Sequence, residues 1–174
     1  FDGVQIKACH VYLLGQFYSP LTNHRTQGRY PGTSFQGRMQ LTLDVLESVR
    51  RAVGPDYPVT VRFAVQDYDP AGSTLEEGIQ AGALLEAHGT DLLDLSGGPK
   101  YRFLHPTSKA PGYFGADTKA IRQGRSIPVM VTGGVTQPDQ AEALLEAGCG
   151  DLVGVCRAAV RDPEWGRKAI AQSL

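Results

Sequence analysis

Four side chains that can give or take a proton or a hydrogen bond lie within six residues near the start of the chain: Lys7, Cys9, His10 and Tyr12. They follow an apolar-alternating run, residues 1–6, which predicts a β-strand. Polar groups at the C-terminal end of a strand occupy the usual place for an active site in an α/β protein. We therefore expect chemistry here, although a lone histidine or tyrosine is more often a structural residue.

Two arrangements of these four groups are open. In an extended strand, Lys7 and Cys9 share one side, and His10 and Tyr12 share the other. If the strand ends near Lys7 and the chain turns helical, Lys7 and His10 converge because they are three residues apart. Lys7 and His10 could then hold a carbonyl oxygen while Tyr12 delivers a proton.

Two glycine-rich segments late in the chain predict a phosphate site. Gly133-Gly134 is followed about 20 residues later by Gly154 and then by Cys156-Arg157. Glycines let backbone N–H groups approach an anion closely, and a helix that starts near Cys156 adds its positive end. Arg157 supplies a forked cation. The alternative is two ordinary strand-to-helix turns with a solvated arginine.

Arg62 lies inside an apolar run, where an unpaired guanidinium would be costly. Its spacing allows a buried salt bridge with Asp67 or Asp94, or a contact with a ligand. If a flavin were bound, a cation here could stabilise the negative charge of the reduced ring.

The composition is that of one ordinary folded domain. With 174 residues and 41% hydrophobic content, the chain predicts a single domain, residues 1–174, with a buried core. Its 17 basic and 18 acidic residues argue against nucleic-acid binding through bulk charge. Apolar runs are too short to span a bilayer and no signal peptide opens the chain, so we expect a cytoplasmic protein with no membrane partner.

The cysteine and histidine patterns predict neither a disulfide nor a metal site. Three cysteines are odd in number and mostly far apart, which fits free thiols. The histidines lack partners at metal-ligand spacing. They are His10, His24, His88 and His105.

Periodicity predicts strands that alternate with helices. We expect strands near positions 4, 61, 93, 129 and 153. We expect a long loop over 22–38 and helices over 41–53, 74–88, a short stretch to 124, a stretch to about 147, and 157–174 with a break at 162–163. Ser73 with Glu76, and Thr136 with Asp139, are the expected helix caps.

An internal repeat supports this division. Ala-Leu-Leu-Glu-Ala at 83–87 recurs at 143–147, and each copy is followed after three residues by Asp-Leu. Such alternation predicts parallel βαβ units, either in an open doubly wound sheet or in a barrel that lacks its first strands. The glycine-rich strand ends favour the barrel, although a complete barrel needs about 250 residues.

The chain resembles the old yellow enzyme family of FMN-dependent NAD(P)H oxidoreductases nearly from end to end. The first matching segment contains Ile-Lys-Ala-Cys-His-Val-Tyr, and the matches together cover residues 1–26, 61–62, 94–98, 127–134, 151–157 and 162–165. The family is a (βα)8 barrel, and this chain is similar to its strands four to eight. The resemblance implies FMN as cofactor and NAD(P)H as reductant.

The resemblance also assigns roles to individual residues. His10 belongs to the pair that binds the substrate carbonyl, and Tyr12 matches the proton donor to the substrate's α-carbon. Arg62 matches the arginine beside the flavin ring. The phosphate grip corresponds to Gly133, Gly134 and Arg157, with the backbone of Cys156.

The chain departs from the family pattern at several positions. Lys7 stands where many members carry histidine, and Cys156 stands where most have glycine. The loop over 30–38 lacks the usual Glu and Asn. Strands one to three are absent, so we expect an open barrel that pairs with another copy or with a missing N-terminal half, or that belongs to a longer polypeptide.

These observations predict an FMN-dependent oxidoreductase of the ene-reductase kind, which reduces a small activated alkene or carbonyl compound. Tyr12 would protonate the substrate while His10 and Lys7 polarise its carbonyl. The alternative is a catalytically silent half-barrel whose phosphate site serves as a binding or assembly module.

Overall fold

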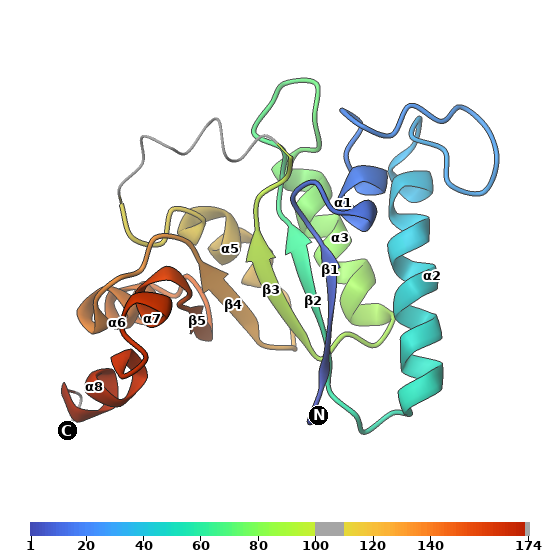
Figure 1. The fold of residues 1–174 in the computed structure, drawn as a ribbon. Coiled ribbons are helices and arrows are strands. Elements are labelled where there is room, and N and C mark those ends of the chain that lie inside the picture. Colours follow the sequence, from blue (N-terminus) through green and yellow to red (C-terminus); the bar gives the residue numbers. More distant parts are fainter. Residues whose placement is uncertain (100–109, 173–174) are drawn as a thin grey trace.

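A five-stranded parallel sheet forms the centre of the molecule. The computed structural model describes residues 1–99 and 110–172. The strands lie in the sheet in chain order (Figure 1). A doubly wound sheet reverses its strand order, whereas a barrel does not. The predicted partial barrel is therefore confirmed, and so are all five strands: β1 (Val4–Ala8), β2 (Val59–Ala64), β3 (Leu92–Ser96), β4 (Val129–Thr132) and β5 (Leu152–Gly154).

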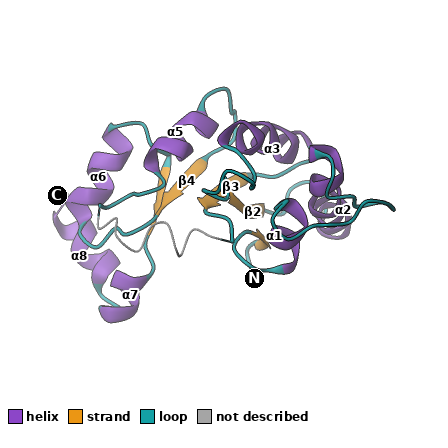
Figure 2. Cartoon of the chain, turned by 90° about the horizontal axis from the view of Figure 1, so that it is seen from above, coloured by secondary structure: helices purple, strands orange, loops and turns teal. Residues whose placement is uncertain are grey.

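The larger helices form an arc outside the strands, and among the described residues no helical layer covers the opposite face of the sheet (Figure 2). Neighbouring helices in this arc contact one another, α2 with α3 and α3 with α5. The predicted break at 162–163 separates α7 from α8. The helices described are α1 (Leu13–Tyr18), α2 (Phe35–Val53), α3 (Leu75–Ala87), α5 (Gly115–Arg122), α6 (Pro138–Glu146), α7 (Arg157–Arg161) and α8 (Trp165–Gln172).

Helix α2 begins six residues before the predicted position, so the predicted loop over 22–38 is too long. The helix starts at Phe35 because the side chain of Ser34 accepts a hydrogen bond from the Gly37 backbone N–H, 3.2 Å away. A serine that satisfies an early backbone donor is a strong N-cap. The apolar pattern alone could not reveal this start, because the first turns of the helix carry few apolar residues.

Both predicted N-caps are wrong by one residue. Helix α3 is capped by Thr74, whose side chain accepts from the Glu77 backbone N–H at 3.2 Å. Ser73 points its backbone N–H to Asp67 instead. Helix α6 is capped at Gln137, whose backbone N–H donates to the side chain of Gln140 at 3.2 Å.

The helix-covered face of the sheet carries the core. Because side chains alternate along a strand, one set from each strand points to the helices. Phe63 is fully buried there, and its ring centroid lies 4.7 Å from that of Tyr18 in α1. The other members of this buried layer are Ile6, Ala8, Val59, Val61, Leu93, Leu95, Val129 and Val131.

The aspartate that follows each copy of the internal repeat binds the first residue of a neighbouring strand. Asp91, which follows its first copy, accepts a hydrogen bond from the Val59 backbone N–H at 2.7 Å and pairs with Arg50 at the end of α2. Asp151, which follows the second copy, accepts from Val129 at 2.9 Å and pairs with an arginine at the end of α5. Each aspartate thus joins a helix end to the first residue of a neighbouring strand.

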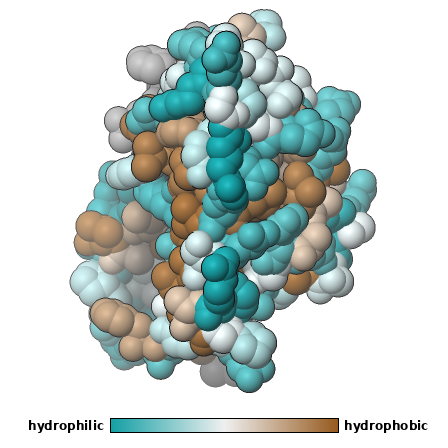
Figure 3. Space-filling model, turned by 90° about the vertical axis from the view of Figure 1, so that its right-hand side faces the viewer, coloured by the Kyte–Doolittle hydropathy of each residue, from teal (hydrophilic) through white to brown (hydrophobic). Residues whose placement is uncertain are grey.

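The side of the molecule that carries α2 and the edge strand β1 is partly apolar. Figure 3 shows a band of apolar side chains between hydrophilic ones on this side. Near the N-terminus, Val4, Val11 and Leu13 are among the exposed large apolar residues. Among the helices that the structure describes, none combines the length and apolar character needed to cross a membrane.

Removing the Phe63 ring should destabilise the chain strongly. We expect Phe63→Ala to lower the free energy of unfolding by about 3–5 kcal/mol, because the fully buried ring would leave a cavity. Leu152→Ala is the matched control on the opposite face of the sheet, where the side chain is 42% exposed, and should cost less than about 1 kcal/mol. Urea unfolding measures both, and equal losses would contradict the assignment of the core to the helical face.

Candidate functional site

The chain turns sharply after β1, and this turn fixes His10. Strand β1 ends at Ala8, and His10 adopts a left-handed conformation with φ 56°. Its backbone N–H donates to the Gly97 carbonyl at 3.2 Å, and its Nε2 lies 2.8 Å from Ser96 Oγ. Both partners come from the end of β3. His10 is therefore held against the C-terminal edge of the sheet by its backbone and by its ring.

Lys7 and Tyr12 meet at the same edge. Lys7 Nζ lies 4.2 Å from the centroid of the Tyr12 ring, a cation–π distance. Tyr12 is the N-cap residue of α1 and is 54% exposed. Lys7 thus contacts Tyr12 and His10 contacts Ser96, two contacts that spacing alone did not indicate.

Cys9 lies between these groups but is buried. Its burial raises the pKa of the thiol to about 11, against the opposing positive charges of Arg62 and Lys7. A protonated, inaccessible thiol is a poor nucleophile. The geometry therefore assigns Cys9 to packing.

Arg62 finds its partner in Asp94, one of the two aspartates that the sequence allowed. The β1–β2–β3 register aligns Lys7 with Arg62 and Arg62 with Asp94 on the face of the sheet without helices. Arg62 Nη1 lies 3.4 Å from Asp94 Oδ2, and Gln5 Nε2 donates to the same oxygen at 3.3 Å. The burial of Asp94 raises its pKa, and the charge of Arg62 opposes that shift most strongly.

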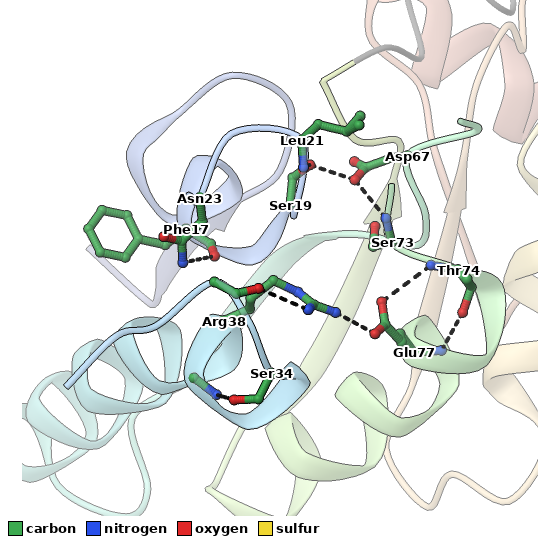
Figure 4. Close-up of polar contacts among 12 residues, drawn as sticks. Phe17, Ser19, Leu21, Asn23, Ser34, Arg38, Asp67, Ser73, Thr74 and Glu77 are labelled. Carbon is green, nitrogen blue, oxygen red and sulfur yellow. Dashed lines mark hydrogen bonds and ion pairs between the residues drawn. The ribbon is translucent and has the colours of Figure 1, made fainter. Parts of the chain in front are cut away.

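Asp67, the other aspartate that the sequence allowed as a partner of Arg62, instead joins the end of α1 to the start of α3. Figure 4 shows its carboxylate between Ser19, just after α1, and Ser73, just before α3. Asp67 Oδ2 accepts from Ser19 Oγ at 2.5 Å and from the Ser73 backbone N–H at 2.8 Å. Burial raises the pKa of Asp67, and these hydrogen bonds oppose the rise. Arg38 joins α2 to α3 through Glu77 in the same region.

The predicted phosphate-binding segments lie side by side at the ends of β4 and β5. The register pairs Thr132 with Gly154, so the residues that follow each of them leave the sheet at the same edge. Gly133 and Gly134 have φ values of 112° and 74°, which glycine adopts without strain. Cys156 caps α7, and Arg157 is its first residue and exposed.

An aromatic ring covers one side of this glycine turn. A Cβ on Gly133 would lie 2.8 Å from the Tyr113 ring, and one on Gly134 would lie 3.2 Å from it. Both positions therefore require glycine for space as well as for φ. The cradle formed by bare backbone, together with the exposed Arg157, suits a phosphate group.

Sequence reasoning missed three residues of this region, Gln5, Ser96 and Tyr113. Gln5 and Ser96 could have been found, because strand alternation places them on the same face as Lys7 and Asp94. The predicted partners of Arg62 included Asp94 but did not reveal its burial. Tyr113 gave no local signal, because its contact with Gly133 depends on the tertiary fold.

The histidines that the sequence offers as possible metal ligands have different surroundings in the structure. His88 Nδ1 lies 2.7 Å from the Leu84 carbonyl at the end of α3, and His24 is exposed in the loop after α1. His105 lies outside the described residues. Within the described ranges, no group of three or more potential metal ligands occurs.

The sequence profile of the NADH:flavin oxidoreductase / NADH oxidase family matches residues 1–173. The chain belongs to this family. The family is FMN-dependent and uses NAD(P)H, and the predicted relation to old yellow enzymes is confirmed.

Curated relatives in this family are longer than this chain. It is 37% identical to an NADH oxidase of Thermoanaerobacter brockii, over 97% of this chain and 26% of that protein. It is 39% identical to a metal reductase of Desulforamulus reducens, over 98% of this chain and 26% of that protein. An NADPH dehydrogenase of Halalkalibacterium halodurans is 32% identical over 97% of this chain and 48% of its own length. The chain thus spans about a quarter to a half of these relatives.

Solved structures of the family share the fold. A 2-naphthoyl-CoA reductase in complex with 2-naphthoyl-CoA superposes with a TM-score of 0.85 at 27% identity, over 99% of this chain and 26% of that one. An old yellow enzyme from Trypanosoma cruzi superposes with a TM-score of 0.74 at 23% identity, over 99% of this chain and 44% of that one. The second likeness concerns the fold alone.

The burial of Cys9 predicts unequal thiol reactivity. At pH 8, iodoacetamide should label the exposed Cys156 at least ~100-fold faster than Cys9, because a pKa of about 11 leaves roughly one Cys9 thiol in 1000 ionised. Peptide mass spectrometry gives both rates. In urea the rates should converge, and equal rates in the folded protein would contradict a packing role for Cys9.

Proposed function

We propose that this chain supplies the FMN-binding and proton-donating part of an NAD(P)H oxidoreductase that reduces activated alkenes. The observation that carries the proposal is the row of Lys7, Arg62 and Asp94 on the helix-free face of the sheet, with Tyr12 and His10 at its end. Two cations, a proton donor and an imidazole at one sheet edge suit a substrate that gains electron density on a carbonyl oxygen. Membership of an FMN-dependent family supports the same assignment.

The residues of the chain fit the flavin group at two places. Gly133, Gly134 and the backbone of Cys156 would hold the phosphate, with Arg157 as its counter-charge. Arg62 would face the flavin ring, since its buried Nε has no hydrogen-bond partner among the described residues and its side chain is 30% exposed. When bound, FMN supplies hydride transfer between NAD(P)H and the alkene.

The remaining roles belong to side chains at the end of β1. His10 and Lys7 orient and polarise the carbonyl oxygen of the substrate, which activates its alkene. Tyr12 holds a proton on its hydroxyl and delivers it to the α-carbon. The Lys7 ammonium contacts the Tyr12 ring and so holds the two side chains together at this edge.

The open face of the sheet favours a second element in the working protein. Strand β1 pairs only with β2 and β5 only with β4 within the described residues, so both sheet edges are unpaired there. We propose that a second copy or the N-terminal half of a barrel covers this face and completes the substrate site. A silent half-barrel that retains only its phosphate site is the alternative, and flavin binding distinguishes the two.

Purified protein should bind FMN with a visible flavin absorbance band. Arg157→Ala should weaken this binding about tenfold or more, because a hydrogen bond to a charged group contributes about 1.5–3 kcal/mol. Arg161→Ala, at the other end of α7, is the matched control and should change the Kd by less than about twofold. Fluorescence quenching of FMN measures the Kd. No band at saturating FMN would refute the enzymatic role of this chain on its own.

Replacing the Tyr12 hydroxyl should separate the two half-reactions. Tyr12→Phe should slow alkene reduction by about 100-fold or more, the usual contribution of a general acid, and should leave flavin reduction by NAD(P)H within about threefold. Tyr57→Phe is the control, since the Tyr57 hydroxyl donates to the Phe1 carbonyl at the opposite end of β1. Stopped-flow absorbance follows both steps, and equal losses in both would exclude Tyr12 as the proton donor.

A further inference from the structure

The ion pair between Arg62 and Asp94 joins two strands across the face of the sheet that would hold the flavin ring. The two residues occupy directly paired positions on β2 and β3. Asp94 is nearly covered, with 5% of its side chain exposed, whereas 30% of the Arg62 side chain is exposed. The carboxylate is therefore the fixed, buried end of the pair, and the guanidinium is the accessible end.

One oxygen of the Asp94 carboxylate makes the contacts with Arg62 and Gln5. Only Oδ2 of its carboxylate has partners in the described part of the chain, Arg62 Nη1 at 3.4 Å and Gln5 Nε2 at 3.3 Å. Its Oδ1 is buried without a hydrogen-bond partner among those residues. Burying a carboxylate with one oxygen left without a hydrogen bond is unfavourable. A buried ion pair of this kind contributes little to the net free energy of unfolding. A role in orienting Arg62 explains why such a group lies on this face.

The geometry also leaves the guanidinium able to bind something else. An arginine has five N–H donors in a rigid fork, and the ion pair with Asp94 engages one nitrogen, Nη1. Anchoring one arm of a planar group restricts the directions that its other arms can take. Pre-organisation of this kind reduces the conformational entropy that a ligand contact would otherwise have to overcome.

We propose that Asp94 is a positioning residue, which acts through Arg62 by holding its guanidinium toward the flavin ring. This inference rests on the proposed FMN site and extends it by one residue. Asp94 does not itself touch the cofactor. Its effect on FMN binding must therefore disappear when Arg62 is absent, whereas a general structural effect on the sheet would persist.

A double-mutant cycle on FMN affinity tests this dependence. The variants are Asp94→Ala, Arg62→Ala and the double variant, and the FMN Kd is measured by fluorescence quenching. With Arg62 present, Asp94→Ala should raise the Kd at least about fivefold; with Arg62→Ala in the background, it should change the Kd by less than about twofold. Equal effects in both backgrounds would overturn the proposal.

Two further variants keep the test decisive. Asp94→Asn preserves the size of the side chain but removes its charge, and it replaces Asp94→Ala if circular dichroism shows that the alanine variant does not fold. Asn should raise the Kd about threefold or more in the presence of Arg62, and no change would overturn the proposal. Asp44→Asn, which removes the charge of an aspartate on α2 that pairs with Arg29, is the matched control and should leave the Kd within about twofold. A wild-type chain that binds no FMN would instead refute the proposed function, and this inference with it.

Discussion

The in-register pairing of β1, β2 and β3 is the constraint on which the site depends. Because parallel partners point to the same side of a sheet, the ladder places Lys7, Arg62 and Asp94 in one row and their apolar neighbours Ile6, Val61 and Leu93 in another. A slip of one residue in any strand would exchange the two faces. Among the described residues the helices cover only the apolar face, so the same register that buries the core also places the charged row on the face without helices.

A charged row of this kind is unusual for the inside of a barrel, which is normally filled by layers of Val, Ile and Leu. Here Gln5, Lys7, Arg62 and Asp94 occupy positions on the inward face of the first three strands, while Met130 and Leu152 continue the row on β4 and β5. The inward face is therefore polar near Tyr12 and apolar toward the other end. This division suits a cofactor whose ring is both flat and able to carry negative charge.

The sequence determined much of this arrangement, because its signals are local or periodic. Strand positions, the repeat and the two allowed partners for Arg62 followed from alternation and spacing, and the structure decides for Asp94. The start of α2 at Ser34, the shifted caps, the contact of Lys7 with Tyr12 and the position of Tyr113 could not be predicted. The contact of Tyr113 with Gly133 depends on the tertiary fold. The others depend on which of several nearby partners a group takes: the Ser73 backbone N–H, for example, donates to Asp67, and Thr74 caps the helix. The two segments proposed to bind phosphate were predicted from residue type, whereas their adjacency required the β4–β5 register.

The two ends of the sheet differ in how firmly they are held, and this difference bears on how a ligand would act. Around β1 and β2, buried Asp67 and the Tyr18–Phe63 ring pair fix the turn that carries His10 and Tyr12. Around β5, the strand has three residues, none of them buried, and helix α6 likewise has no buried residue. Local stability follows buried contacts, so the end with the glycine cradle has the lower free energy of local opening. A ligand that binds only the closed form adds its binding free energy to that end. Phosphate binding at Gly133 and Arg157 would therefore stabilise the half of the sheet that its own core holds least well.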